Sequence, residues 1–389
     1  MAGSSSANRG RPPSARLGWP LTIATSLSLV LVAFALWAFW TIRFHPEGID
    51  FVSFWSAGRM VIEGTPAAAY DIAAHHRLEL SVAPDTGLMP FPYPPPFLLL
   101  VTPFALASFA AAFMLWDLVG GAFYAFAGRR VAPLMYVLAN PPVLVAFMIG
   151  QSSLLTGGIL ILGLTMVASA PFLGGAVLGL LIIKPQLALM LPVAMLAGRQ
   201  WRTIAGALLS SLALLLLALL LLGLESYGGF LAILPTYAEF MRHGSWDWAT
   251  VASPFGFARY FGSSASAAMV VQAAIAVAAA AITATAWAKD WEQKVPILAA
   301  ASLLATPYLF TYDAILLLIP AGVLIREQRF GSLAVLWALT ALPVLTGYHL
   351  YDGPNTIPLA CLFSIALMAA PRFTRSTTTR RPPTRQAAV

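Results

Sequence analysis

Residues 171–198 read PFLGGAVLGLLIIKPQLALMLPVAMLAG, and Lys184 is the only charged residue among them. A membrane-spanning helix needs about 20 apolar residues, and this stretch is longer than that. Proline interrupts a helix, and a lysine is unfavourable inside a bilayer. We therefore expect two short apolar helices that meet at Lys184-Pro185, which is typical of a membrane protein with broken helices.

The composition of the whole chain agrees with this interpretation. Of its 389 residues, 59% are hydrophobic and only 10% are charged. A soluble domain carries roughly a quarter charged residues, so this chain cannot cover a globular surface with polar groups. We predict an all-α polytopic membrane protein, a transmembrane helix bundle of about 12 spans and within a range of about 10 to 14.

The other apolar segments divide the chain into spans, loops and tails. We expect segment 295–325 to break at 311–313, and segment 94–127 to form either one tilted helix or two helices broken near Ser108. The long outer loops are 43–93 and 225–265, and residues 18–371 form one transmembrane domain. Residues 1–17 and 372–389 are rich in Ser, Arg and Pro and are expected to be disordered tails. The remaining candidate spans are 20–42, 131–149, 152–169, 203–224, 266–288, 331–348 and 355–371.

The basic residues predict the orientation, because short cytoplasmic loops carry an excess of Lys and Arg. If the spans alternate, fourteen basic residues fall on one side and most acidic residues fall on the other. Both termini are then cytoplasmic in a multi-pass protein of the inner membrane. The net charge of +7 is a topology signal, and no nucleic-acid partner is expected. The basic set is Arg9, Arg11, Arg16, Arg199, Arg202, Lys289, Lys294, Arg326, Arg329, Arg372, Arg375, Arg380, Arg381 and Arg385.

Residues 48–71, GIDFVSFWSAGRMVIEGTPAAAYD, follow the first apolar segment. Residues 50–63 predict an external juxtamembrane helix whose Phe51 and Phe54 lie along the membrane surface. Asp50 would begin that helix, where a carboxylate can serve as an N-cap. It can also face a water-filled site, because a charge near the bilayer is tolerated when it meets water rather than lipid.

Four stretches carry a resemblance to a known family. They are IDFVSFWSAGRMVIEGTPAAAYD (49–71), FPYPPPFLLLVTPFAL (91–106), NPPVLVAFMIGQSSLL (140–155) and GGAVLGLLIIKPQLALMLPVAMLAGRQWR (174–202). Over roughly residues 20–330 the chain resembles the DUF2029 type of integral-membrane glycosyltransferase, glycosyltransferase family 87 of the GT-C superfamily. In some members a histidine occurs where this chain has TPYLFTYD (306–313).

The resemblance implies a GT-C-like fold and a hexosyltransferase that uses a polyprenyl-phosphate sugar, commonly mannose, as its donor. The acceptor would be a lipid or a glycan at the outer face of the membrane. Asp50 matches the position of the family's catalytic aspartate. An inverting transfer needs a general base that takes the proton of the acceptor hydroxyl.

Other side chains are candidates for substrate binding, each beside a simpler interpretation. Arg59 and Lys184 could stabilise the charge of the leaving phosphate. Gln151 could bind a sugar hydroxyl or cap a helix, and Asp71 could cap a helix or serve the site. Tyr93 is an interfacial aromatic residue or a ligand, and Tyr312 and Asp313 lie at a break that lines a cavity or merely separates two helices.

Several classes of chemistry lack their sequence signals. There is no spaced His/Asp/Glu cluster for zinc, no Asp-x-Asp and no glycine-rich phosphate loop, so neither a metal nor another cofactor is expected. His75, His76 and His243 are interpreted as solvated loop residues. The alternative function is a multispan transporter or lipid flippase, and a scaffold for envelope assembly is a third. Internal repeats are lacking and the polar residues gather on one face, which favours an enzyme.

Overall fold

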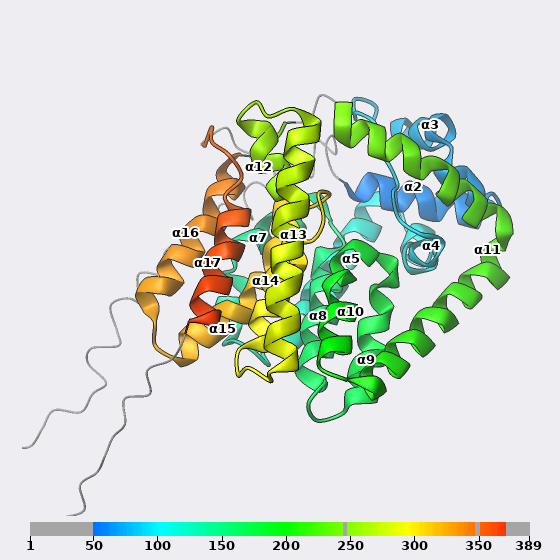
Figure 1. Ribbon diagram of the computed structural model, residues 1–389. Coiled ribbons are helices and arrows are strands. Elements are labelled where there is room, and N and C mark those ends of the chain that lie inside the picture. The colour runs from blue at the N-terminus through cyan, green and yellow to red at the C-terminus, as the bar shows by residue number, and fades with distance from the viewer. Residues whose placement is uncertain (1–49, 244–246, 347–350, 371–389) are drawn as a thin grey trace, which may run out of the picture.

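The computed structural model describes residues 50–243, 247–346 and 351–370. Every regular element in these ranges is helical, which confirms the predicted all-α class (Figure 1). The predicted first span, 20–42, and both predicted tails lie outside the described residues. The α-helices are α2 (Phe51–Ile62), α3 (Ile72–Val82), α4 (Pro95–Val101), α5 (Phe109–Gly128), α6 (Leu134–Leu138), α7 (Pro141–Ile149), α8 (Ser153–Met166), α9 (Pro171–Gly179), α10 (Met190–Ala197), α11 (Trp201–His243), α12 (Pro254–Tyr260), α13 (Ala265–Ala288), α14 (Lys294–Leu304), α15 (Leu318–Arg326), α16 (Phe330–Thr346) and α17 (Ile357–Ala369).

Short 3-10 helices join several of these elements. They are η2 (Pro66–Tyr70), η3 (Phe104–Leu106), η4 (Leu180–Ile183), η5 (Pro185–Ala188) and η6 (Thr311–Leu317). Within the described ranges, three helices are long and apolar enough to cross a membrane: Phe109–Gly128, Trp201–Arg242 and Ala265–Ala288. The total of about 12 spans stays a prediction.

The helix breaks lie close to where the sequence predicts them. Lys184 separates η4 from η5, so segment 171–198 is interrupted at Lys184-Pro185 as expected. Segment 94–127 adopts the second of its two alternatives, because α5 begins directly after Ser108. Segment 295–325 also breaks, but its irregular part begins at Ala305, well before the expected 311–313.

A further break lies before Gln151, in a segment expected as one span unless 94–127 crosses the membrane twice. Segment 131–149 consists of α6 and α7, with Asn140 between them. Pro141 and Pro142 occupy the first turn of α7, where a missing N–H is tolerated but where the preceding helix must end. The single span expected over 131–149 is therefore two short helices.

Helix α11 extends well past the predicted span 203–224. At Gly223 the backbone adopts φ 75° and ψ 166°, which only glycine adopts readily, and the helix changes direction there. Figure 1 shows the two arms meeting at a sharp angle. The second arm packs on η2, with the Tyr70 and Phe230 ring centroids 5.8 Å apart. The predicted outer loop 225–265 therefore begins as a helix that covers the first loop.

The prediction that residues 50–63 form a surface helix, with aromatic residues along the membrane surface, is wrong for α2. Phe51 and Phe54 are completely or almost completely buried. Both rings pack against Trp116 of α5, with centroid distances of 5.8 and 5.6 Å. Burying these large rings against one another removes more apolar area from water than laying them on an interface. Helix α2 is thus part of the core, with Asp50 at its start.

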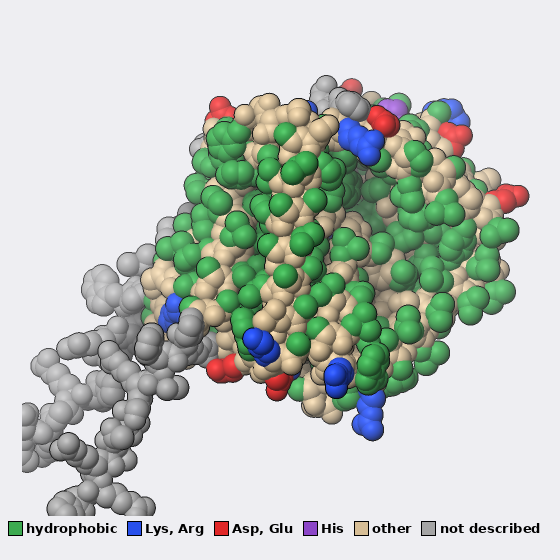
Figure 2. All heavy atoms as spheres, in the orientation of Figure 1, with side chains coloured by type: hydrophobic (Ala, Val, Ile, Leu, Met, Phe, Trp, Pro, Cys, Tyr) green, Lys and Arg blue, Asp and Glu red, His purple; other side chains and the backbone are tan. Residues whose placement is uncertain are grey.

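The basic loops after α10, α13 and α15 lie at one end of the bundle in Figure 1, away from α2, α3 and α12. Arg326 Nη1 donates to the carbonyl of Val131 at 2.9 Å, so the Arg129-Arg130 turn lies at this end too. Figure 2 shows a broad apolar band with most charged side chains toward its two ends. This arrangement suits a protein surrounded by lipid at mid-height.

Candidate active site

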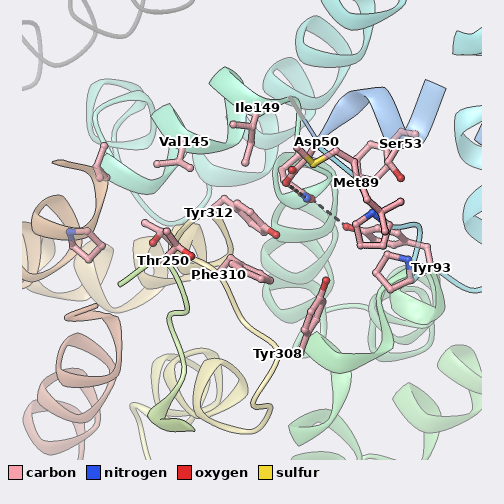
Figure 3. A pocket seen from close by; sticks show the side chains of 18 residues that line it. Asp50, Ser53, Met89, Tyr93, Val145, Ile149, Thr250, Tyr308, Phe310 and Tyr312 are labelled. Atoms are coloured by element: carbon pink, nitrogen blue, oxygen red, sulfur yellow. Dashed lines mark hydrogen bonds between the residues drawn. The ribbon is translucent and has the colours of Figure 1, made fainter. Parts of the chain in front are cut away.

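A cavity of about 340 Å³ opens at the start of α2 (Figure 3). Its walls come from six parts of the chain: the first turn of α2, the loop before α4, helix α7 with the turn after it, the loop before α12, the segment from Tyr308 into η6, and helix α16. Segment 305–312 follows α14, which runs away from the basic end, so the cavity lies toward the opposite end. The lining residues are Asp50, Ser53, Phe54, Leu88, Met89, Pro90, Pro92, Tyr93, Val145, Ile149, Gln151, Thr250, Tyr308, Phe310, Thr311, Tyr312, Pro343 and Val344.

Asp50 occupies the N-cap position of α2, but its side chain does not cap the helix. Instead, Oδ2 accepts a hydrogen bond of 2.7 Å from Nε2 of Gln151. Burial raises the pKa of Asp50 to about 6, although the Gln151 hydrogen bond and the charge of Lys184 oppose this rise. The site therefore holds a carboxylate that titrates close to neutral pH, which suits a general base.

Gln151 is oriented by its own partners. Its Oε1 accepts from the backbone N–H of Ser152 at 2.9 Å and from the Tyr93 hydroxyl at 3.2 Å. Because a backbone N–H can only donate, Oε1 must face Ser152, and Nε2 is left to face Asp50. Gly150, at φ 66°, makes the turn that brings Gln151 here, and a Cβ at that position would lie 2.6 Å from Cβ of Phe51.

Lys184 and Asp313 meet behind the cavity wall. Lys184 Nζ lies 2.5 Å from Asp313 Oδ1, and Ser153 Oγ donates to the same oxygen at 2.7 Å. The ammonium also lies 5.1 Å from the centroid of the Tyr312 ring. Neither charged residue lines the cavity. In the structure the positive charge of Lys184 is paired with the carboxylate of Asp313. That Lys184 contacts the donor phosphate remains a prediction.

Arg59 and Asp71 lie apart from the cavity lining. Arg59 bonds Glu63 one turn later at 3.2 Å and lies over the ring of Trp55. Asp71 accepts from the backbone N–H of Ala74 at 2.9 Å and so caps α3. Of the predicted substrate-binding residues, the structure thus brings Tyr93, Gln151 and Tyr312 into one cavity with Asp50. The roles of all of them in binding remain predictions.

The structure adds residues that the sequence interpretation missed. Ser53 and the aromatic pair Tyr308 and Phe310 line the cavity. The alternation of Tyr308 and Phe310 in YLF (308–310) was a usable signal, because alternate residues of an extended segment share a face.

The interpretation of His75 as a solvated loop residue is wrong. It lies in α3 and is only 2% exposed, with Nε2 at 3.2 Å from Ser53 Oγ. His76 is partly buried in the same helix, and its Nδ1 lies 3.0 Å from Glu79 Oε2. Helix α3 folds back onto α2, which brings these side chains inside. The side chain of His243 lies outside the described residues.

Residues 91–320 match the model of glycosyltransferase family 87. The chain belongs to glycosyltransferase family 87. The match begins in the loop that carries Tyr93 and ends in α15, so it includes Gln151, Lys184 and Asp313. No curated protein and no solved structure matches the chain.

Membership of family 87 makes this chain a membrane glycosyltransferase, with a sugar donor and an acceptor as its substrates. Its cavity offers a carboxylate, an amide and several hydroxyl groups, which suit proton transfer and the binding of sugar hydroxyls. Within residues 50–243, 247–346 and 351–370, no group of three or more His, Cys, Asp or Glu side chains could hold a metal ion.

Proposed function

We propose that this family 87 enzyme transfers mannose from a polyprenyl-phosphate donor to a lipid or glycan acceptor at the outer face of the inner membrane. Asp50 acts as the general base. The observation that supports this role most strongly is that Asp50 begins a helix without capping it and turns its carboxylate into the cavity. A residue kept only as a cap would bond the helix N–H groups, as Asp71 does in α3.

In the proposed step, the acceptor oxygen attacks the anomeric carbon of the donor. The new C–O bond forms as the bond between that carbon and the phosphate oxygen breaks. The configuration at the anomeric carbon is inverted. The acceptor proton passes to Asp50, and polyprenyl phosphate leaves with the electron pair. The amide of Gln151 holds the carboxylate in one orientation, which lowers the entropy lost on reaching the reactive geometry.

The loop before α4 and the walls of α7 and α16 give the cavity an apolar side. Met89, Val145, Ile149 and Val344 line it. Such a surface suits the lipid part of a substrate, whereas the Asp50 side suits its polar part. This division supports a substrate that carries both a sugar and a lipid.

The test is Asp50→Asn in protein purified into lipid nanodiscs. Radiolabelled polyprenyl-phosphate mannose and a crude lipid extract are supplied, and a new labelled glycolipid is measured. Asn can still accept the Gln151 hydrogen bond but cannot take a proton, so turnover should fall at least about a hundredfold. Asp71→Asn is the matched control and should remain close to wild type. If Asp50→Asn keeps more than about a tenth of turnover, general-base catalysis by Asp50 is wrong.

A further inference from the structure

Three aromatic side chains form one wall of the cavity: Tyr308, Phe310 and Tyr312, called here the aromatic row (Figure 3). Their segment is held in an extended form by the preceding outer loop. Ala252 N–H donates to the Leu309 carbonyl at 2.8 Å, and Val251 and Phe310 form a β-bridge. Alternate side chains of an extended segment point the same way, which applies to Tyr308 and Phe310. Tyr312 lies in the first turn of η6 and also lines the cavity.

The rings of the aromatic row support one another in sequence. The Lys184 ammonium lies 5.1 Å from the Tyr312 ring, and Phe310 stacks on Tyr312 with centroids 5.5 Å apart at 25°. Tyr308 meets Phe310 edge to face at 5.2 Å. Tyr312 thus has both a cation and a ring as neighbours, whereas Tyr308 ends the row and is partly exposed. A row supported in this way is rigid before any ligand arrives, which lowers the entropy lost on binding.

Within the described part of the chain the phenol hydroxyls of Tyr308 and Tyr312 make no hydrogen bond, and neither oxygen is among the fully buried atoms that lack a partner. Both residues line the cavity. Other buried tyrosines differ: Tyr70 bonds the carbonyl of Tyr93, and Tyr124 bonds the carbonyl of Ile315. A hydroxyl on a cavity wall can donate to and accept from a bound ligand. Two hydroxyls available on one cavity wall therefore suit a ligand that carries hydroxyl groups.

We propose that the aromatic row binds a pyranose ring of the acceptor, so that the acceptor is a glycan or the sugar headgroup of a glycolipid rather than a plain lipid alcohol. One C–H face of the sugar packs on Tyr308 and Phe310, and its hydroxyls bond the phenols of Tyr308 and Tyr312. The assignment to the acceptor rests on the proposed function, because the base must meet the acceptor hydroxyl. In Figure 3, Tyr312 lies between Phe310 and Asp50.

The binding test needs neither donor nor turnover. Protein in lipid nanodiscs is mixed with methyl α-D-mannopyranoside, and saturation-transfer NMR reports contact with the ring protons. D-Mannitol is the comparison probe, since it has similar hydroxyl groups but no rigid ring face. We expect transfer to the pyranoside and little to mannitol. Equal signals for the two probes, or none for the pyranoside, would overturn the proposal.

Variants locate the binding surface. Tyr308→Leu and Phe310→Leu should each weaken pyranoside binding about tenfold or more, and Tyr308→Phe, which keeps the ring, about threefold. Phe261→Leu is the matched control, because Phe261 is 64% exposed and does not line the cavity. A wild-type affinity in Tyr308→Leu would exclude the aromatic row.

Kinetics then separate acceptor from donor. In the transfer assay, Tyr308→Leu should raise the acceptor KM about tenfold and leave the donor KM within about twofold. A rise confined to the donor KM would assign the row to the donor sugar and overturn the proposal. Asp50→Asn should still bind the pyranoside, so a failure of the general-base mechanism and a failure of the aromatic row give different results.

Discussion

The ammonium of Lys184 lies 2.5 Å from the carboxylate of Asp313, and both side chains are almost completely buried. The two residues belong to different helix breaks, since Lys184 separates η4 from η5 and Asp313 lies in η6. Their ion pair therefore joins two interrupted helices directly behind the wall that carries Tyr312. The hydroxyl of Ser153, at the start of α8, donates to the same carboxylate at 2.7 Å, so a third element contacts the ion pair.

Breaking this ion pair should destabilise the fold more than removing it completely. Lys184→Met leaves the Asp313 carboxylate buried without its cation and should lower the free energy of unfolding by about 3–5 kcal/mol. Lys184→Met combined with Asp313→Leu removes both charges and should recover most of that loss. Denaturation of purified protein in detergent measures both variants. A double variant less stable than the single one would show that the polar contacts, rather than the unpaired charge, dominate.

The activity of the enzyme should depend on pH through Asp50. Burial raises the pKa of this carboxyl from 3.8 to about 6. A general base works only when ionised, so kcat/KM should be constant above about pH 7 and fall about tenfold per pH unit below about pH 5. A profile that stays flat down to pH 4.5 would show that no base with a raised pKa takes part.

Gln151 should affect both the rate and this pH dependence. Gln151→Leu removes the 2.7 Å hydrogen bond that orients Asp50 and lowers its pKa. We expect turnover to fall about tenfold and the acidic limb to move to higher pH. Gln200→Leu is the matched control, because the Gln200 amide donates to the Gly198 carbonyl at 3.1 Å and Gln200 does not line the cavity. Equal effects of the two variants would refute an orienting role.

Asp71 should contribute to stability and little to catalysis. Its carboxylate caps α3 through the Ala74 N–H. Asp71→Ala should cost about 1 kcal/mol of folding free energy and Asp71→Asn only a few tenths, with transfer within about twofold of wild type. Thermal unfolding and the glycolipid assay test the two parts separately. A hundredfold loss of transfer in Asp71→Asn would show that Asp71 takes part in catalysis.

The orientation in the membrane can be tested by labelling. Thr65 lies in an exposed turn after α2, and Lys289 is exposed at the basic end of α13. In a Cys361→Ser background, Thr65→Cys should react with a membrane-impermeant thiol reagent in cells whose outer envelope is permeabilised. Lys289→Cys should react only after the inner membrane is disrupted. The reverse pattern would invert the proposed topology.

The amino-acid sequence alone determined the class of the protein and much of its local structure. Long apolar runs require lipid as solvent and helices as elements, because backbone groups in a bilayer must bond within their own segment. The break at Lys184-Pro185 follows from local chemistry, as does the start of α5 after Ser108. The division between α6 and α7 also follows from local sequence, at Asn140-Pro141-Pro142. We nevertheless expected one span there, because the segment is apolar throughout.

Only the tertiary structure decided which polar residues meet. Asp50 and Gln151 are about a hundred positions apart in the sequence, and Lys184 and Asp313 are further apart still. No sequence periodicity could therefore predict that these residues meet. The same holds for Asp50 and Asp71, which both begin helices in one outer loop: only packing shows that Asp71 caps its helix and Asp50 does not. Helical patterns depend on neighbours three and four residues away, whereas a site depends on side chains that distant segments bring together when their apolar faces pack.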